Sequence, residues 1–143
     1  MRLQTRFVVL ALSCVVLLSC AHSGAQDQVS GGLADRAVQE ELILGVEAYA
    51  KAKGFRFGDG AEYMLRSSAE LGARDISQLP RASQDRKKLE AKRNLEKFVD
   101  AMIEASKEIP GYSEQHPGVI GEQTFAAARK KLCPLWPICG KPA

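Results

Sequence analysis

The chain has 143 residues, of which 45% are hydrophobic and 26% charged, and its formal net charge is +3. This length and composition suit one modest globular domain and exclude a large multidomain enzyme, a collagen-like chain and a wholly disordered one. Aromatic residues make up 6% of the chain, which weighs against an aromatic-lined carbohydrate cleft or a base-stacking platform.

The N-terminus is typical of a secretory signal. Arg2 and Arg6 flank the start of an apolar run of 13 residues, Phe7–Ser19. A helix that crosses a bilayer needs about 20 apolar residues, so this run is short for a permanent span. Loss of the two arginines on export lowers the formal net charge from +3 to +1. The exported chain then has no broad basic field, and we expect no nucleic-acid partner.

The apolar run ends in Leu17-Leu18-Ser19-Cys20, which resembles the bacterial lipobox. The resemblance implies that residues 1–19 are a signal peptide and that Cys20 is lipidated, which anchors the protein at a membrane facing the periplasm. Ala21 follows, and a non-aspartate at that position favours the outer membrane in the enterobacterial sorting pattern. Cleavage after Ser23-Gly24-Ala25 is the alternative and gives a secreted or soluble periplasmic protein. Retention of the run as an anchor is a third interpretation.

Residues 20–32 are predicted to be a flexible tether, because Ala21–Gly32 is small and polar. Fully extended, such a tether reaches ~40 Å. The remainder, residues 33–143, is predicted to be a single helical domain. Its first helix is expected over 33–53 and ends at Gly54. The stripe that predicts this helix is Val38, Leu42, Gly45, Val46 and Tyr49.

The glycine-rich segment Phe55–Gly60 follows. It lacks the spacing and the lysine of a phosphate-binding loop. We expect its two phenylalanines to fill the core, and a brief extended segment fits their alternation with Arg56.

A second helix is predicted over Ala61–Leu71. Asp59 and Glu62 resemble a capping box at its start, and Gly72 is expected to end it. The segment Ala73–Arg81 is then a connector that Pro80 closes, with Ile76 and Leu79 directed inward.

The third and longest helix is predicted over Ala82–Ile109 and is stopped by Pro110. Its first half, from Asp85 to Lys97, mixes acids and bases, which favours a solvated face over a polyanion-binding patch. Its second half carries the pattern of a core-facing stripe. That stripe is Leu95, Phe98, Val99, Met102 and Ile103.

A turn-rich loop over Gly111–Gly121 precedes a fourth helix, Glu122–Leu132. Cys133 and Cys139 then remain for an oxidising compartment, where a local disulfide is the favoured interpretation over a redox pair or a metal site. We expect no metal and no cofactor. Leu135, Trp136 and Ile138 are expected to fold back on the helices.

These elements predict an all-α fold, an irregular bundle of about four helices with a C-terminal disulfide loop. Catalytic candidates are few, because the chain has two histidines and one of them, His22, lies in the tether. Nothing resembles a nucleophile elbow around His116, and acid pairs occur on any helical surface. We therefore assign no catalytic residue, and an enzyme remains the lowest alternative.

Residues 99–132 resemble the small helical peptidoglycan-binding repeat. The resemblance is carried by an apolar helix, by Gly111-Tyr112, by the loop Gly118-Val119-Ile120-Gly121 and by a helix with Thr124 and Ala127. Pro117 stands where the repeat has an aspartate, and the third helix of the repeat is missing. The resemblance implies wall association without cleavage. Its candidate binding residues are Tyr112, His116, Gly118, Gly121 and Thr124.

The sequence therefore predicts a non-enzymatic, lipid-anchored envelope protein that acts as a binding module for peptidoglycan. The alternative is a periplasmic inhibitor or immunity-type protein that blocks another envelope protein through the charged face Asp85–Lys97. The candidate cations for that alternative are Arg86, Lys88, Lys92 and Arg93. An accessory of a cell-wall hydrolase, or a hydrolase itself, is the lower alternative.

Overall fold

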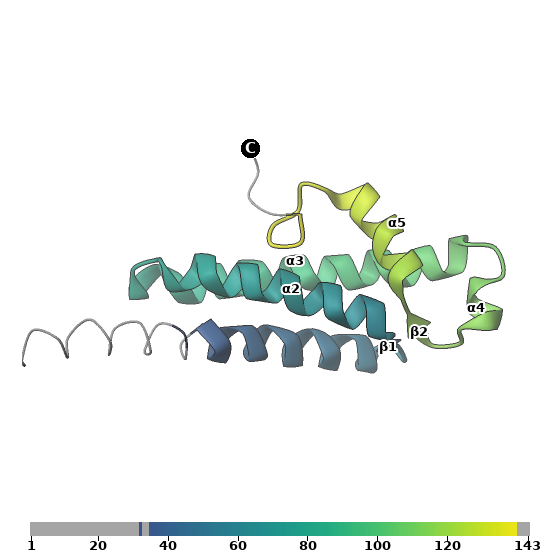
Figure 1. Cartoon of the computed structure of the whole chain (residues 1–143), viewed down its shortest axis with the longest axis horizontal. Coiled ribbons are helices and arrows are strands. Elements are labelled where there is room, and N and C mark those ends of the chain that lie inside the picture. The colour runs from purple at the N-terminus through teal and green to yellow at the C-terminus, as the bar shows by residue number, and fades with distance from the viewer. Residues whose placement is uncertain (1–31, 33–34, 140–143) are drawn as a thin grey trace, which may run out of the picture. The chain divides into compact units, whose positions relative to one another are not determined.

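The computed structural model describes residue 32 and residues 35–139 (Figure 1). The predicted signal peptide, the Cys20 lipidation site, the alternative cleavage point after Ala25 and nearly all of the tether lie outside these residues. From Asp35 onward the described chain belongs to one compact unit. None of the helices in the described ranges has the length and apolarity that a membrane span requires.

The fold is all-α, as predicted, apart from two very short strands. A helix over residues 35–52 comes first. The elements that follow are β1 (Arg56–Phe57), α2 (Asp59–Ser77), α3 (Arg81–Glu108), α4 (Tyr112–Gln115), β2 (Val119–Ile120) and α5 (Glu122–Leu132). Figure 1 shows the three long helices running lengthwise beside one another, with α5 inclined across α3.

The core lies between these helices. The predicted stripe of α3, from Leu95 to Ile103, is buried as expected, and the Phe98 ring meets the Phe125 ring of α5 edge-on at 4.8 Å between centroids. On the first helix, Leu42 and Val46 are buried, whereas other members of the predicted stripe are only partly covered. Burial of this core removes apolar surface from water and supplies the main stabilisation of the fold.

The first helix ends at residue 52, one residue before the predicted end, and the chain turns at Gly54, which adopts a φ of +82° that a side chain would disfavour. Phe55 and Phe57 follow and pack partly buried against the core. β1 pairs in parallel with β2, so that Arg56 lies beside Val119 and Phe57 beside Ile120. The extended segment at β1 was expected, but its partner β2 was placed in a loop.

The second helix is longer than predicted. α2 runs through Gly72 to Ser77, so the predicted stop at Gly72 and the connector from Ala73 are wrong. Gly72 is buried inside the helix, and a Cβ at that position would lie 3.2 Å from Pro137. The glycine therefore admits the C-terminal loop to the helix surface instead of ending the helix.

The start of α2 also differs from the prediction. Gly58 is the N-cap and makes no side-chain capping bond, so the expected capping box of Asp59 and Glu62 does not form. Both acids nonetheless lie in the first turn, where the helix dipole favours negative charge. Glu62 accepts a hydrogen bond of 3.1 Å from Nε of Arg66, one turn along the helix.

The helices after α2 agree closely with the prediction. α3 is displaced by one residue at each end from the expected bounds, and α5 has the expected bounds. The expected loop 111–121 contains the four-residue helix α4 and the strand β2.

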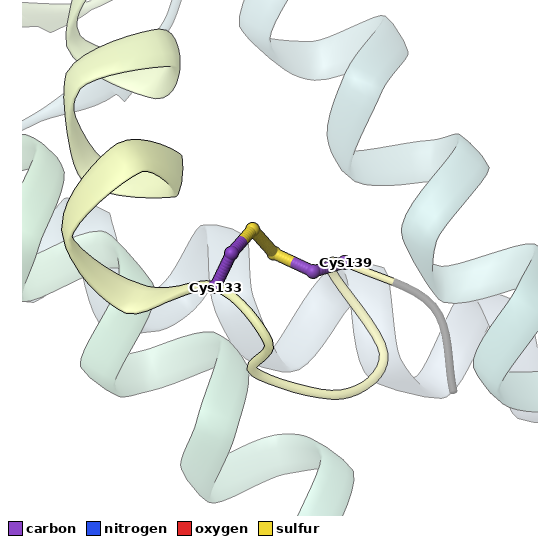
Figure 2. The surroundings of a disulfide bond; sticks show 2 residues. All are labelled: Cys133 and Cys139. Carbon is purple, nitrogen blue, oxygen red and sulfur yellow. A yellow bond between two sulfur atoms is a disulfide. The ribbon is translucent and has the colours of Figure 1, made fainter. Parts of the chain in front are cut away.

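The C-terminal loop, Cys133–Cys139, is closed by the predicted disulfide, whose Cα atoms lie 5.6 Å apart (Figure 2). Trp136 and Ile138 fold back on the helices as expected and are 8% and 7% exposed. The carbonyl of Trp136 accepts a hydrogen bond of 2.8 Å from Nδ2 of Asn94 on α3. The loop is therefore attached to α3 as well as to α2.

Candidate binding site

The structure places the side chains of two candidate wall-binding residues inside the protein. Tyr112, the first residue of α4, is 5% exposed and Thr124 is 0% exposed. The Tyr112 hydroxyl occupies the space beside Gly121, because a Cβ on that glycine would lie 2.8 Å from it. Tyr112 and Gly121 therefore fit each other as packing partners.

Thr124 stabilises the start of α5. Its hydroxyl accepts a hydrogen bond of 3.0 Å from the N–H of Gly121 and donates one of 2.8 Å to the carbonyl of Gly121. Side-chain bonds of this kind satisfy backbone groups that a helix terminus leaves unpaired. The hydroxyl is thus engaged within the protein.

Gly118 has a backbone role. It adopts a φ of +65°, and a Cβ there would lie 3.1 Å from the carbonyl oxygen of Gly54. The bond from the N–H of Arg56 to the carbonyl of Gly118, 2.9 Å long, begins the pairing of β1 with β2. Of the five candidates, His116 alone has a side chain exposed to solvent, and its ring lies 4.9 Å from that of Tyr112.

A second polar cluster joins the end of the first helix to α3. The Tyr49 hydroxyl donates to both carboxylate oxygens of Asp100, at 3.1 and 2.9 Å, and Lys53 Nζ donates to the same carboxylate. The hydrogen bond to Asp100 raises the pKa of Lys53 well above its ordinary value. A lysine held protonated in this way cannot serve as a general base.

No group of three or more His, Cys, Asp or Glu side chains in the described ranges is arranged to hold a metal ion.

A hollow with a volume of about 620 Å³, named here the α3 groove, lies along the half of α3 that precedes Phe98. Its charged lining comprises Arg86, Lys87, Glu90, Arg93 and Lys97, and its neutral polar lining comprises Ser83 and Asn94. Leu79 and Leu89 supply its apolar lining, and Leu89 is 48% exposed. Four cations therefore face one carboxylate in this groove.

Three of these cations form no ion pair, although Glu90 lines the same groove. Lys87 Nζ pairs with Glu90 at 2.8 Å, whereas Arg86, Arg93 and Lys97 make no ion pair or side-chain hydrogen bond with any described residue. Elsewhere on the helices, some cations, such as Lys107 and Lys131, are paired with glutamates at 2.8 and 2.7 Å, and others, such as Lys130, form no ion pair with a described residue. The α3 groove is thus a site of positive charge that the described part of the protein does not neutralise.

The C-terminal loop contacts two of the residues that line the groove. Lys87 Nζ lies 4.3 Å from the centre of the Trp136 ring, a cation–π contact, and Asn94 donates to the Trp136 carbonyl. Lys87 and Asn94 are therefore held by contacts with Trp136, which lies more than 40 positions later in the chain. Sequence spacing alone could not have identified Lys87 and Asn94 as members of the site.

The other two cations singled out from the sequence lie outside the α3 groove. Lys88 Nζ approaches Glu41 of the first helix at 3.3 Å, and Lys92 Nζ approaches Glu96 at 3.9 Å. Both line a neighbouring hollow of about 220 Å³, and Leu89 lines both hollows. The charged segment of α3 therefore has two sides, and Arg86, Arg93 and Lys97, which form no ion pair with a described residue, all lie on the side of the α3 groove.

No family model matches the chain, and no curated protein and no solved structure shows significant similarity to it. Inference of function therefore rests on the chemistry of the chain's own residues.

Proposed function

We propose that the chain is an exported, lipid-anchored protein of the bacterial envelope that acts by binding and restraining a second envelope protein through the α3 groove. The observation that carries the proposal is the set of three cations without acidic partners, Arg86, Arg93 and Lys97, beside the exposed Leu89. The apolar run and the Leu17–Cys20 pattern support the export and the anchor.

A protein partner suits this chemistry. Complementary charge across an interface speeds association and selects the partner, and arginine is enriched among residues that dominate binding energy. An exposed leucine next to the cations supplies apolar contact area that a purely electrostatic site lacks. The groove is thus suited to the acidic surface of an inhibited or neutralised protein, such as a cell-wall hydrolase.

The arrangement of the loop between Tyr112 and Thr124 supports wall association less than the α3 groove supports a protein partner. Tyr112 and Thr124 are buried, so a wall polymer would reach only exposed residues of the segment between them, such as His116. A Tyr112→Ala change would unfold the loop whether or not it contacts the wall. Co-sedimentation with purified sacculi should therefore compare the wild type with His116→Ala; saturable binding lost in that variant would favour the wall.

The partner is tested in cells by site-specific photo-crosslinking. A photoreactive amino acid in place of Ser83, which lines the groove and is not one of its cations, probes the groove, and the same amino acid at Tyr63, which is 74% exposed on α2, is the control. We expect a discrete crosslinked product from position 83 alone, lost with Lys97→Glu and retained with Lys130→Glu on α5. Equal products from both positions, or none from position 83, would contradict the proposal.

The anchor is tested separately by metabolic labelling with a fatty acid. We expect Cys20→Ala to abolish the label and to release the chain from the membrane fraction. A labelled Cys20→Ala variant would contradict Cys20 as the lipidation site, and unlabelled wild-type protein would contradict lipidation and leave the ordinary cleavage after Ala25.

A further inference from the structure

The three cations without acidic partners form a line along α3. Arg86, Arg93 and Lys97 are separated by seven and four residues, which places them within about 40° of one another around the helix axis. The helical rise separates them by about 10 Å and 6 Å along the axis. A ligand that meets all three must therefore be long and must carry its negative charges on one side.

A carboxylate interrupts this line. Glu90 lies between Arg86 and Arg93, and its Oε2 is 2.8 Å from Lys87 Nζ. Lys87 is in turn held over the Trp136 ring. Along the line, Arg86, Glu90, Arg93 and Lys97 thus carry a positive, a negative, a positive and a positive charge. A polymer with a negative charge on every repeat would place one charge against Glu90, whereas a protein can place a neutral or basic residue there.

The flank of the line is apolar. Leu89 is 48% exposed, and Leu79 also contributes to the lining. A phosphate polymer offers nothing that gains free energy from contact with these side chains. An amphipathic helix does, because it can present an apolar residue beside its acids on the same face.

We infer that the α3 groove binds an acidic amphipathic helix of the partner protein, which lies along α3 with carboxylates opposite Arg86, Arg93 and Lys97. A neutral or basic residue of that helix faces Glu90, and an apolar side chain covers Leu89. Because both helices rise by the same distance per residue, the partner's acids recur at separations of four and seven residues. This inference rests on the proposed function and specifies its partner.

Two designed helical peptides of identical composition test the inference. The matched peptide carries three glutamates at separations of four and seven, a lysine opposite Glu90 and a leucine for Leu89. The permuted peptide spreads the same residues around the helix. Each is titrated by calorimetry into the detergent-solubilised, lipidated full chain with its disulfide intact, at low ionic strength.

We expect the matched peptide to bind at least about tenfold more tightly than the permuted one. Arg93→Glu should remove this preference, and Lys130→Glu, an equal change of charge on α5, should retain it. Arg93 is exposed, so circular dichroism of the variant should match the wild type. Equal binding of the two peptides would overturn the inference, as would tighter binding of inorganic polyphosphate than of the matched peptide.

The crosslinking experiment separates this inference from the function on which it rests. If the matched peptide is bound no more tightly than the permuted one while position 83 still crosslinks to a partner, the partner is not such a helix and the proposed function stands. Loss of the crosslink as well would overturn both.

Discussion

Trp136 Nε1 donates a hydrogen bond of 2.9 Å to Oδ2 of Asp75, which joins the C-terminal loop to α2 across 61 positions of sequence. The carbonyl of the same tryptophan is bound by Asn94 of α3. Trp136 thus connects two helices that also pack directly against each other. The loop is an integral part of the bundle and not an appended tail.

Removal of the indole N–H should weaken this connection. Replacement of Trp136 by benzothienylalanine keeps the shape of the ring system and puts sulfur in place of the N–H. A hydrogen bond to a carboxylate contributes about 1.5 kcal/mol or more, so we expect the free energy of unfolding to fall by about that amount. Denaturation followed by far-UV circular dichroism measures it, and unchanged stability would show that the bond contributes nothing.

Two helical glycines should respond oppositely to alanine. Gly45 of the first helix has no atom within 4 Å of an added Cβ, whereas at Gly72 the Cβ would lie 3.2 Å from Pro137. We expect Gly45→Ala to stabilise the protein by about 0.5–1 kcal/mol through helix propensity. Gly72→Ala should destabilise it by about 1 kcal/mol, because crowding against the loop exceeds that gain.

Thermal unfolding of the two variants measures the contrast. Equal stabilisation by both changes would mean that the C-terminal loop does not restrict α2 at Gly72.

Thr124 should contribute to the stability of the folded protein and not to contact with the wall. Thr124→Val keeps the side-chain shape but removes both hydrogen bonds to Gly121, so we expect a loss of about 1–3 kcal/mol in the free energy of unfolding. Thr124→Ser keeps the hydroxyl and should lose less. Chemical denaturation compares the two, and a valine variant as stable as the serine variant would rule out the capping role.

The Lys53–Asp100 contact should weaken in strong alkali. Asp100 raises the pKa of Lys53 in the folded protein above its ordinary value of 10.5. A raised pKa stabilises the folded state fully below that ordinary value, and the contribution declines as the pH rises through the folded pKa.

We therefore expect the difference in Tm between the wild type and Lys53→Met to be constant from about pH 7 to 9 and to shrink above about pH 10.5. A difference that had already vanished at about pH 9 would show that Asp100 does not hold the proton on Lys53.

The helices that could be predicted are those whose limits are encoded locally. Pro110 stops α3 and Pro134 follows the end of α5, and regular apolar spacing marks their inner faces. The end of α2 could not be predicted, because glycine is a helix-ending residue by local preference, whereas Gly72 lies within the helix and leaves room for Pro137 of the distant C-terminal loop. β2 could not be predicted because it pairs with a distant strand: the paired residues Arg56 and Val119 lie 63 positions apart in the sequence.

The candidate site could be predicted in part. Arg86 and Arg93 were identified from the mixed charges of α3, but the sequence did not say which cations share a face with acids of other elements. Lys88 illustrates this, because Glu41 of the first helix approaches it. Thr124 was chosen for its polarity and its place in a repeat-like pattern, neither of which reveals that its hydroxyl is satisfied internally.

Trp136 is the chain's one tryptophan, and it lies between the carboxylate of Asp75 and the ammonium group of Lys87. Indole emission depends on the charges around the ring. An acid that draws Lys87 toward a bound partner would change the emission wavelength, and so would release of the loop when the disulfide is reduced. The protein thus carries a native fluorophore at the edge of its groove, through which occupancy can be followed without a label.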